Sequence, residues 1–220
     1  MKMTLSLLLL SLISLNSWAQ NKDGFSLEMF GGSFSVQNAF GSKYDYQGIK
    51  AWTGIAFEAG AGAAFRQNAG QNQQWGLKLG ISRMAFSYTG SDYVDGNGNT
   101  QIYRPQSTRR IYFNFSPIYA FRLAESSSFD FDLESSLSIK LPINAYSLSL
   151  DAAQNNTDIN DFDRYSLGEL SVFQARIAPT FVWETTRLGV YFAYNVNSGS
   201  NWESISGWGA GLQISYFVED

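Results

Sequence analysis

The stretch FDFDLESSLSIKL, from Phe129 to Leu141, alternates between two kinds of side chain along its whole length. Its odd-numbered positions are apolar apart from Ser135, and its even-numbered positions are acidic, basic or serine. Side chains of a β-strand point alternately to opposite faces, so this pattern predicts a strand with one apolar and one polar face. It is also long: a tilted strand needs ~9–11 residues to cross a bilayer, whereas strands of globular proteins have about 5–6.

The same alternation recurs in seven further segments. The predicted strands are Phe25–Val36, Trp52–Phe65, Trp75–Tyr88, Arg110–Phe121, Leu167–Trp183, Leu188–Val196 and Trp208–Phe217, with Phe129–Leu141 the fifth in chain order. Past Gly31 and Gly32 the apolar positions change from odd to even numbers, which predicts a β-bulge at these glycines. Met84, Phe86 and Tyr88 indicate a similar change of phase near the end of the third strand.

The connections between the predicted strands alternate between short and long. The short ones are residues 66–74, 122–128 and 184–187, and the long, polar ones are residues 37–51, 89–109, 142–166 and 197–207. Outer-membrane barrels have short turns at one end and long loops at the other. We therefore expect an all-β fold, an eight-stranded antiparallel up-and-down transmembrane barrel with short periplasmic turns and long extracellular loops.

The composition excludes several classes of protein. Only 15% of the residues are charged, against about 25% in an average soluble domain, and 16% are aromatic. A net charge of -4 argues against a nucleic-acid partner, because phosphate-binding surfaces carry clustered lysine and arginine. The chain has no cysteine, so disulfides, thiolate metal sites and a lipid anchor on an N-terminal cysteine are excluded. It has no histidine, the commonest general base and metal ligand, and we expect no cofactor.

The first nineteen residues have the features of a secretory signal peptide. Met1, Lys2 and Met3 form a short cationic start, a run of leucine, isoleucine and serine follows, and Ser17 and Ala19 occupy the small-residue positions of a cleavage site. An uncleaved N-terminal helix is the alternative. We expect residues 1–19 to be removed and residues 20–220 to form a single exported barrel domain.

The nature of the two faces predicts which of them lines the barrel. A soluble ligand-binding barrel would hold its apolar face inward and needs a polar exterior. Here the non-apolar face is mainly glycine, alanine and serine with a few charges, which suits the narrow interior of an eight-stranded barrel. The bulky apolar face is then predicted to contact lipid. The aromatic residues expected to form two girdles at the membrane interfaces are Trp52, Trp75, Phe121, Phe129, Trp183 and Trp208.

In these features the sequence resembles the small eight-stranded outer-membrane barrels, the family of the OmpA transmembrane domain and OmpX, and the barrel-domain proteins of Bacteroidetes. The signal peptide ending at Ala19 and Gln20, the rhythm of strands and connections over residues 25–217, and the last strand ending at Tyr216 and Phe217 carry this resemblance. It implies location in the outer membrane of a Gram-negative bacterium, contact with lipid and lipopolysaccharide, and insertion by the barrel assembly machinery. We expect a monomer. The family often ends on an aromatic residue, whereas this chain continues to Asp220.

Charged residues on the polar face are expected to meet inside the barrel. Those predicted to face inward are Glu58, Lys78, Arg110, Asp130, Asp132, Glu134, Lys140 and Arg176, with Glu28 added if the phase of the first strand is right. A buried charge without a partner costs several kcal/mol, on the order of the desolvation penalty of an ion, so these residues should form ion pairs. Counting from the short turns predicts pairs between Glu58 and Lys78 and between Glu134 and Arg176. A plug of ion pairs is expected, and a proton or ion path is the alternative.

No arrangement of residues predicts catalysis. The lipid A deacylase and palmitoyltransferase of the outer membrane have this size but use a catalytic histidine, so we expect no enzyme, with a carboxylate site in the long loops left open. Asp95–Asn99 alternates oxygen-bearing side chains as a calcium loop begins, but a tight Asn-Gly turn explains it better. The acidic loop Asp151–Asp163 could collect cations or be solvated. Arg83 is outward in phase and could meet lipopolysaccharide phosphates, or extend to the interface as ordinary membrane arginines do.

Three functions are compatible with this pattern. The first is a structural or interaction protein, whose loops contact an extracellular ligand, a protein or envelope lipids. The second is a narrow pore or gated transport barrel for small solutes, which conductance would reveal. The third, a soluble ligand-binding barrel, would need no detergent.

Overall fold

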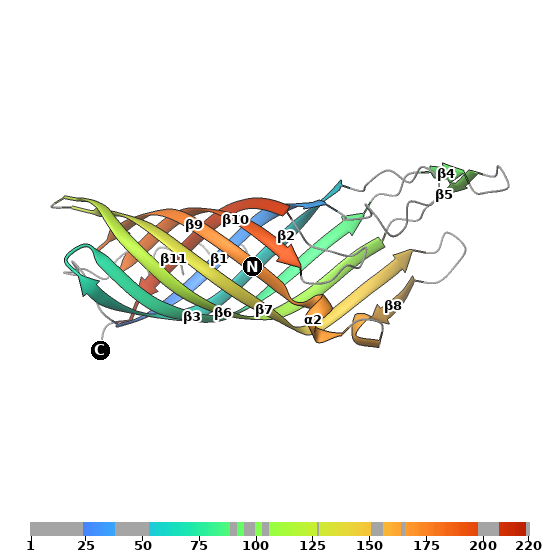
Figure 1. Cartoon of the computed structure of the whole chain (residues 1–220), viewed down its shortest axis with the longest axis horizontal. Helices are drawn as coiled ribbons and strands as arrows, with labels where there is room; N and C mark the ends of the chain where they lie inside the picture. Colours follow the sequence, from blue (N-terminus) through green and yellow to red (C-terminus); the bar gives the residue numbers. More distant parts are fainter. Residues whose placement is uncertain are drawn as a thin grey trace, which may run out of the picture.

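A computed structural model describes residues 24–37, 53–88, 92–94, 100–102, 106–126, 128–150, 156–163, 166–197 and 207–218. Eight of the described strands form a closed barrel (Figure 1). They are β1 (Gly24–Gln37), β2 (Thr53–Gly70), β3 (Gln73–Tyr88), β6 (Gln106–Glu125), β7 (Asp130–Leu150), β9 (Val172–Trp183), β10 (Thr186–Asn197) and β11 (Gly207–Phe217). Each pairs antiparallel with the next barrel strand in the chain, and β1 pairs with β11 to close the ring. The predicted eight-stranded antiparallel up-and-down barrel is confirmed.

The turns and the smaller elements occupy opposite ends of the barrel (Figure 1). Residues 71–72, 126–129 and 184–185 connect β2 to β3, β6 to β7 and β9 to β10. At the other end lie the hairpin of β4 (Asp92–Val94) and β5 (Thr100–Ile102), the strand β8 (Asn156–Asn160) on β7, the 3-10 helix η1 (Asp161–Asp163) and the helix α2 (Leu167–Leu170). No helix in the described part of the chain is long and apolar enough to cross a membrane. The predicted signal peptide, the predicted turn at residues 95–99 and Trp52 lie outside the described residues.

Several strand boundaries differ from the prediction. The sixth barrel strand begins at Val172 rather than Leu167, because Ser166 caps the helix α2 and Glu169 bonds back to it. β6 and β7 are 20 and 21 residues long. β6 begins at Gln106, inside the predicted loop 89–109, and β7 continues to Leu150, inside the predicted loop 142–166. The prediction missed residues 106–109 because all four are polar. It missed residues 142–150 because a register shift with β6 moves the outward apolar positions from Ile143 to Tyr146 and so breaks the alternation.

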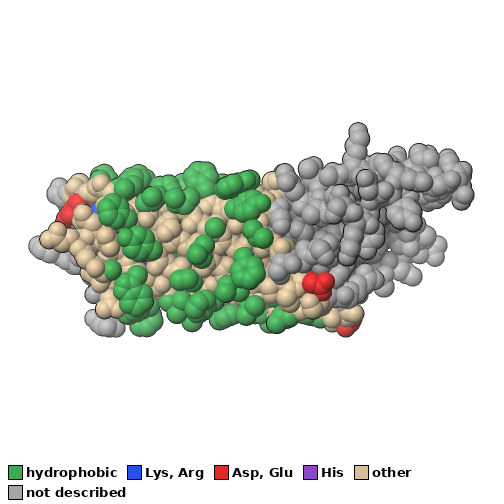
Figure 2. All heavy atoms as spheres, in the orientation of Figure 1, with side chains coloured by type: hydrophobic (Ala, Val, Ile, Leu, Met, Phe, Trp, Pro, Cys, Tyr) green, Lys and Arg blue, Asp and Glu red, His purple; other side chains and the backbone are tan. Residues whose placement is uncertain are grey.

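The predicted orientation of the two faces is confirmed in the described strands. Outward side chains are bulky and apolar, such as Leu137, which is 66% exposed, and Phe181, which is 43% exposed. Inward neighbours are small or charged, such as Ser136 and Ser138. Figure 2 shows hydrophobic side chains spread along the barrel wall, with acidic side chains at the two ends of the described wall. The apolar residues therefore form a belt around a barrel with a polar interior.

The predicted bulge at Gly31 and Gly32 is wrong. β1 pairs without a register shift with both neighbours from Ser26 to Phe34, and Phe34 is only 1% exposed. Even-numbered residues of β1 face inward on both sides of the glycines. Only the type of the inward residue changes, from polar to apolar. Gly32 leaves space for a neighbouring aromatic residue, because a Cβ there would collide with the hydroxyl oxygen of Tyr191.

The third strand shows the same effect. Met84 is fully buried and continues the inward phase of Ser82, and β3 pairs with β6 without a shift. Register shifts occur instead in the pairing of β2 with β3, between Asn68 and Gly70, and in the pairing of β6 with β7. Eight of the buried apolar residues form one cluster, which comprises Phe34, Ala56, Met84, Tyr112, Val172, Ala178, Tyr191 and Ala193, with Phe30 packed against it. The lumen is thus filled by both ionic and apolar side chains.

Candidate functional site: the filled lumen

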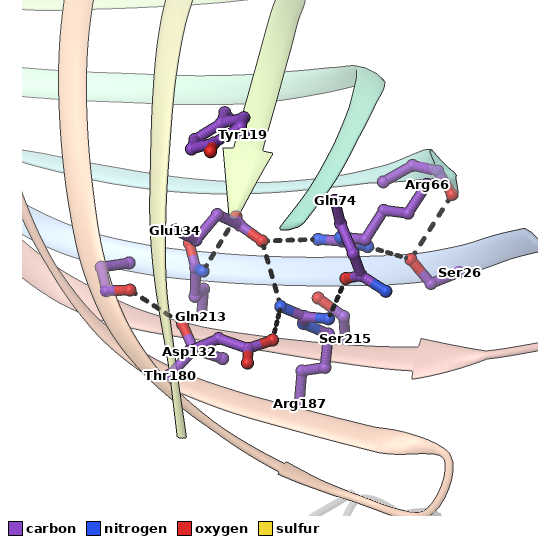
Figure 3. Close-up of polar contacts among 12 residues, drawn as sticks. Ser26, Arg66, Gln74, Tyr119, Asp132, Glu134, Thr180, Arg187, Gln213 and Ser215 are labelled. Atoms are coloured by element: carbon purple, nitrogen blue, oxygen red, sulfur yellow. Dashed lines mark hydrogen bonds and ion pairs between the residues drawn. The ribbon is translucent and has the colours of Figure 1, made fainter. Parts of the chain in front are cut away.

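A network of ion pairs centred on Glu134 fills the lumen towards the short turns (Figure 3). Glu134 Oε2 lies 3.0 Å from Arg66 Nη2 and 3.9 Å from Arg187 Nη2, and its Oε1 lies 3.6 Å from Lys78 Nζ. Gln213 Nε2 donates to the same Oε1 at 3.3 Å. These side chains come from five strands around the barrel, so the network ties distant parts of the wall together.

The cations around Glu134 are shared with other carboxylates. Lys78 Nζ lies 2.6 Å from Glu28 Oε1, and Arg187 Nη2 donates to Asp132 Oδ2 at 2.8 Å. Nearer the turn between β6 and β7, Arg122 pairs with Asp130 at 2.9 Å and with Asp132 at 3.4 Å. Such sharing offsets the cost of removing charges from water.

A second cluster lies further from the short turns. Lys140 Nζ donates to both carboxylate oxygens of Glu58, at 2.5 and 2.7 Å. The Arg176 guanidinium lies between two aromatic rings, 4.8 Å from the centroid of Phe30 and 4.1 Å from that of Tyr191. An enclosed cavity with room for about one water lies among the polar side chains beside this cluster.

Both predicted ion pairs are wrong. Across the strands, Glu58 lies opposite Met84 and Lys78 opposite Ala64, because the turn at 71–72 sets the register of β2 and β3. Arg176 lies opposite Ser136, not opposite Glu134. Arg122 and Asp132 do pair on the neighbouring strands β6 and β7. Glu58, however, pairs with Lys140 across the narrow lumen, so counting along a hairpin could not identify its partner.

The structure buries every residue predicted to face inward. These are Glu58, Lys78, Arg110, Asp130, Asp132, Glu134, Lys140 and Arg176, together with Glu28. It adds Arg66, Arg122 and Arg187, which were predicted to lie in turns. All three continue the inward phase of their strands, so extending the alternation to the turn residues would have found them.

The predicted girdle residues within the described part of the chain lie on the outer wall. Trp75, Phe121, Phe129 and Trp183 are exposed close to the short turns. Trp208 is 70% exposed near the opposite end of β11, where its ring packs against Tyr194 at 4.8 Å between centroids. Arg83 is exposed on the outer face of β3.

Within the described residues, no group of three or more acidic side chains could hold a metal ion. A scan against protein-family models finds no match, and a search of the curated proteins finds no similar sequence.

The cap of α2 lowers the pKa of the Glu169 carboxyl. The backbone N–H of Ser166 donates to it at 2.8 Å and the hydroxyl at 2.9 Å, and both bonds favour the ionised form. A lowered folded-state pKa means that this cap contributes stability above the ordinary pKa of about 4.5, and loses it as pH falls through the folded value.

Replacing Ser166 with alanine is expected to raise the pKa of Glu169 part of the way back, because the backbone donor remains. A carboxyl-carbon NMR titration of Glu169 in wild type and Ser166→Ala measures this. An unchanged pKa would show that the hydroxyl does not stabilise the ionised carboxyl.

Proposed function

We propose that this protein is an integral outer-membrane β-barrel of the structural or interaction type, with a lumen closed by its own side chains. The observation that carries the proposal is the inverted distribution of its side chains. A closed barrel exposes a continuous wall of phenylalanine, leucine, isoleucine and tryptophan and buries most of its described charges. Exposing such an apolar wall to water is unfavourable, whereas exposing it to lipid carries no such free-energy cost.

The interior supports a plug rather than a channel. Ion pairs and the apolar cluster fill the described lumen, and the enclosed cavity beside Lys140 has room for about one water. A conducting barrel of this kind would need these pairs to separate, which is costly for buried charges. The barrel then acts through its surface, by contacts with envelope lipids, a protein or an extracellular ligand, without a cofactor or catalytic site.

The barrel type and the predicted signal peptide support a location in the outer membrane. The polypeptide would be exported, folded into the outer membrane by the barrel assembly machinery, and present there as a monomer. The surrounding lipids would include lipopolysaccharide on the side of the long connections. Residues 1–19 would be absent from the mature protein.

Purification decides between the proposal and a soluble barrel. We expect the protein to require detergent and to migrate differently on gels before and after heating, as folded membrane barrels do. The same sample in planar bilayers should then give no steady conductance. A monomer that stays dissolved in plain buffer would contradict the membrane assignment, and steady currents would favour the alternative of a narrow transport pore.

Replacing Leu137 with arginine tests the lipid-facing wall. Leu137 lies near the middle of the outward apolar positions of β7 and is 66% exposed. An arginine facing lipid at this depth costs about 2–4 kcal/mol of unfolding free energy, and about 0–1 near the interface. The measurement is urea unfolding in lipid vesicles. The matched control is Ser128→Arg, at the exposed turn before β7. A Leu137→Arg variant as stable as the control would mean that this face meets water.

A further inference from the structure

Two arginines stand on the outer wall of neighbouring strands. Arg83 on β3 lies opposite Ile111, and Arg109 on β6 lies opposite Ala85. They are therefore diagonal cross-strand neighbours, with Cα atoms about 7–8 Å apart. Both side chains are exposed, and neither forms an ion pair with another described residue. Of the two, only Arg83 was predicted to face outward, because Arg109 fell in a predicted loop.

On its own strand, each arginine lies just beyond the outward apolar residues. On β3 the exposed apolar residues end at Ile81, and Arg83 is the next outward position. On β6, Arg109 is the next outward position after Ile111, towards the end of the barrel away from the short turns. In a membrane this places both guanidinium groups at the level of the lipid headgroups.

A shallow hollow in the wall adjoins Arg83. Its lining is mostly small, so the wall is recessed there beside the bulkier belt. The lining includes Ser33, Phe57, Ala59, Arg83, Ala85 and Ala210. Glu58 also borders the hollow, but it is only 2% exposed and its carboxylate binds Lys140 in the lumen. Apart from Arg83, Glu58 and Ser33 the lining is glycine, alanine and phenylalanine, which suits an acyl chain beneath a charged headgroup.

We propose that Arg83 and Arg109 together bind a phosphate monoester of lipopolysaccharide, with an acyl chain of that lipid in the adjoining hollow. This inference rests on the proposed function. A phosphate monoester carries a charge of about -1.5 to -2 at neutral pH, which two arginines match, whereas the phosphodiester of a phospholipid carries only one charge. Guanidinium groups also bind phosphate oxygens through two parallel hydrogen bonds, which fixes the orientation of the headgroup.

The test is native mass spectrometry of the folded protein in a neutral detergent, titrated with lipopolysaccharide. The wild type should retain it, and Arg83→Gln/Arg109→Gln should need at least about tenfold more for equal occupancy, since one charge-assisted hydrogen bond contributes about 1.5–3 kcal/mol. Gln67→Glu/Gln73→Glu changes the net charge equally at exposed positions near the short turns and should bind as wild type does. Phosphatidylglycerol and enzymatically dephosphorylated lipopolysaccharide should bind wild type more weakly.

Several results would overturn the inference. These are equal retention by the double-glutamine variant, equal loss in the Gln67/Gln73 control, or equal binding of phosphatidylglycerol or dephosphorylated lipopolysaccharide by the wild type. The lipid comparisons use the wild type alone, so they decide the matter even where a variant does not fold. Failure of the proposed function looks different, because a soluble protein would show neither a detergent requirement nor heat-dependent gel mobility.

Discussion

Replacing Glu134 with glutamine is expected to lower the free energy of unfolding by about 3–5 kcal/mol, the usual cost of leaving buried charges without their partner. Glutamine keeps the size of the side chain, so packing changes little and the loss reports on charge. Three cations approach this carboxylate, Arg66 at 3.0 Å, Lys78 at 3.6 Å and Arg187 at 3.9 Å. Each also has a second carboxylate nearby, Glu28 or Asp132, which keeps the loss within that range.

Urea unfolding in vesicles, followed by tryptophan fluorescence, measures this loss. Glu125→Gln is the matched control, since it removes one carboxylate at an exposed position at the end of β6 and should leave stability unchanged. A Glu134→Gln variant within about 1 kcal/mol of wild type, the scale of an exposed ion pair, would mean that the network around Glu134 is solvated.

Replacing Lys140 with methionine should cost about as much, again about 3–5 kcal/mol. Methionine keeps the long apolar stem and removes the ammonium group. Glu58, which is 2% exposed, then loses the donor that contacts both of its oxygens. Its remaining cationic neighbour is Arg176, which is already held by Gln174 and two aromatic rings.

The double variant Glu58→Gln/Lys140→Met separates loss of an ion pair from creation of an unpaired charge. Removing both partners should recover at least half of the stability lost in Lys140→Met, because no uncompensated carboxylate remains. The same urea unfolding experiment compares the three variants. A double variant less stable than Lys140→Met alone would contradict this expectation, and would mean that attraction between the two groups outweighs their desolvation.

Alternation of apolar and polar residues predicted the barrel well. The alternating side chains of Phe129–Leu141 fit only a strand with one face in an apolar medium and the other in a polar one. The local pattern therefore predicts a strand of a barrel wall. The prediction was wrong where the inner face changes character. At Phe34 and Met84 this face becomes apolar, and the sequence pattern then resembles a bulge although the backbone phase is constant.

The sequence pattern also predicted the ends of the strands poorly. Arg66, Arg122 and Arg187 are polar residues next to turns, so they were assigned to the turns, yet the structure buries all three in the lumen. Arg109 was assigned to a loop and lies on the outer wall of a strand. Polar residues near a turn do not by themselves mark the end of a strand when the barrel interior is itself polar.

The sequence by itself determined the number of barrel strands, their antiparallel order and the inward face of each strand over its alternating core, because each of these depends on local alternation and on connection length. Only the tertiary structure decided which charges meet. Glu58 with Lys140, and Glu134 with Arg66, are 82 and 68 residues apart and join opposite parts of the wall. Such partners depend on the register of every hairpin and on the closure of the ring, and an error at one turn displaces all of them.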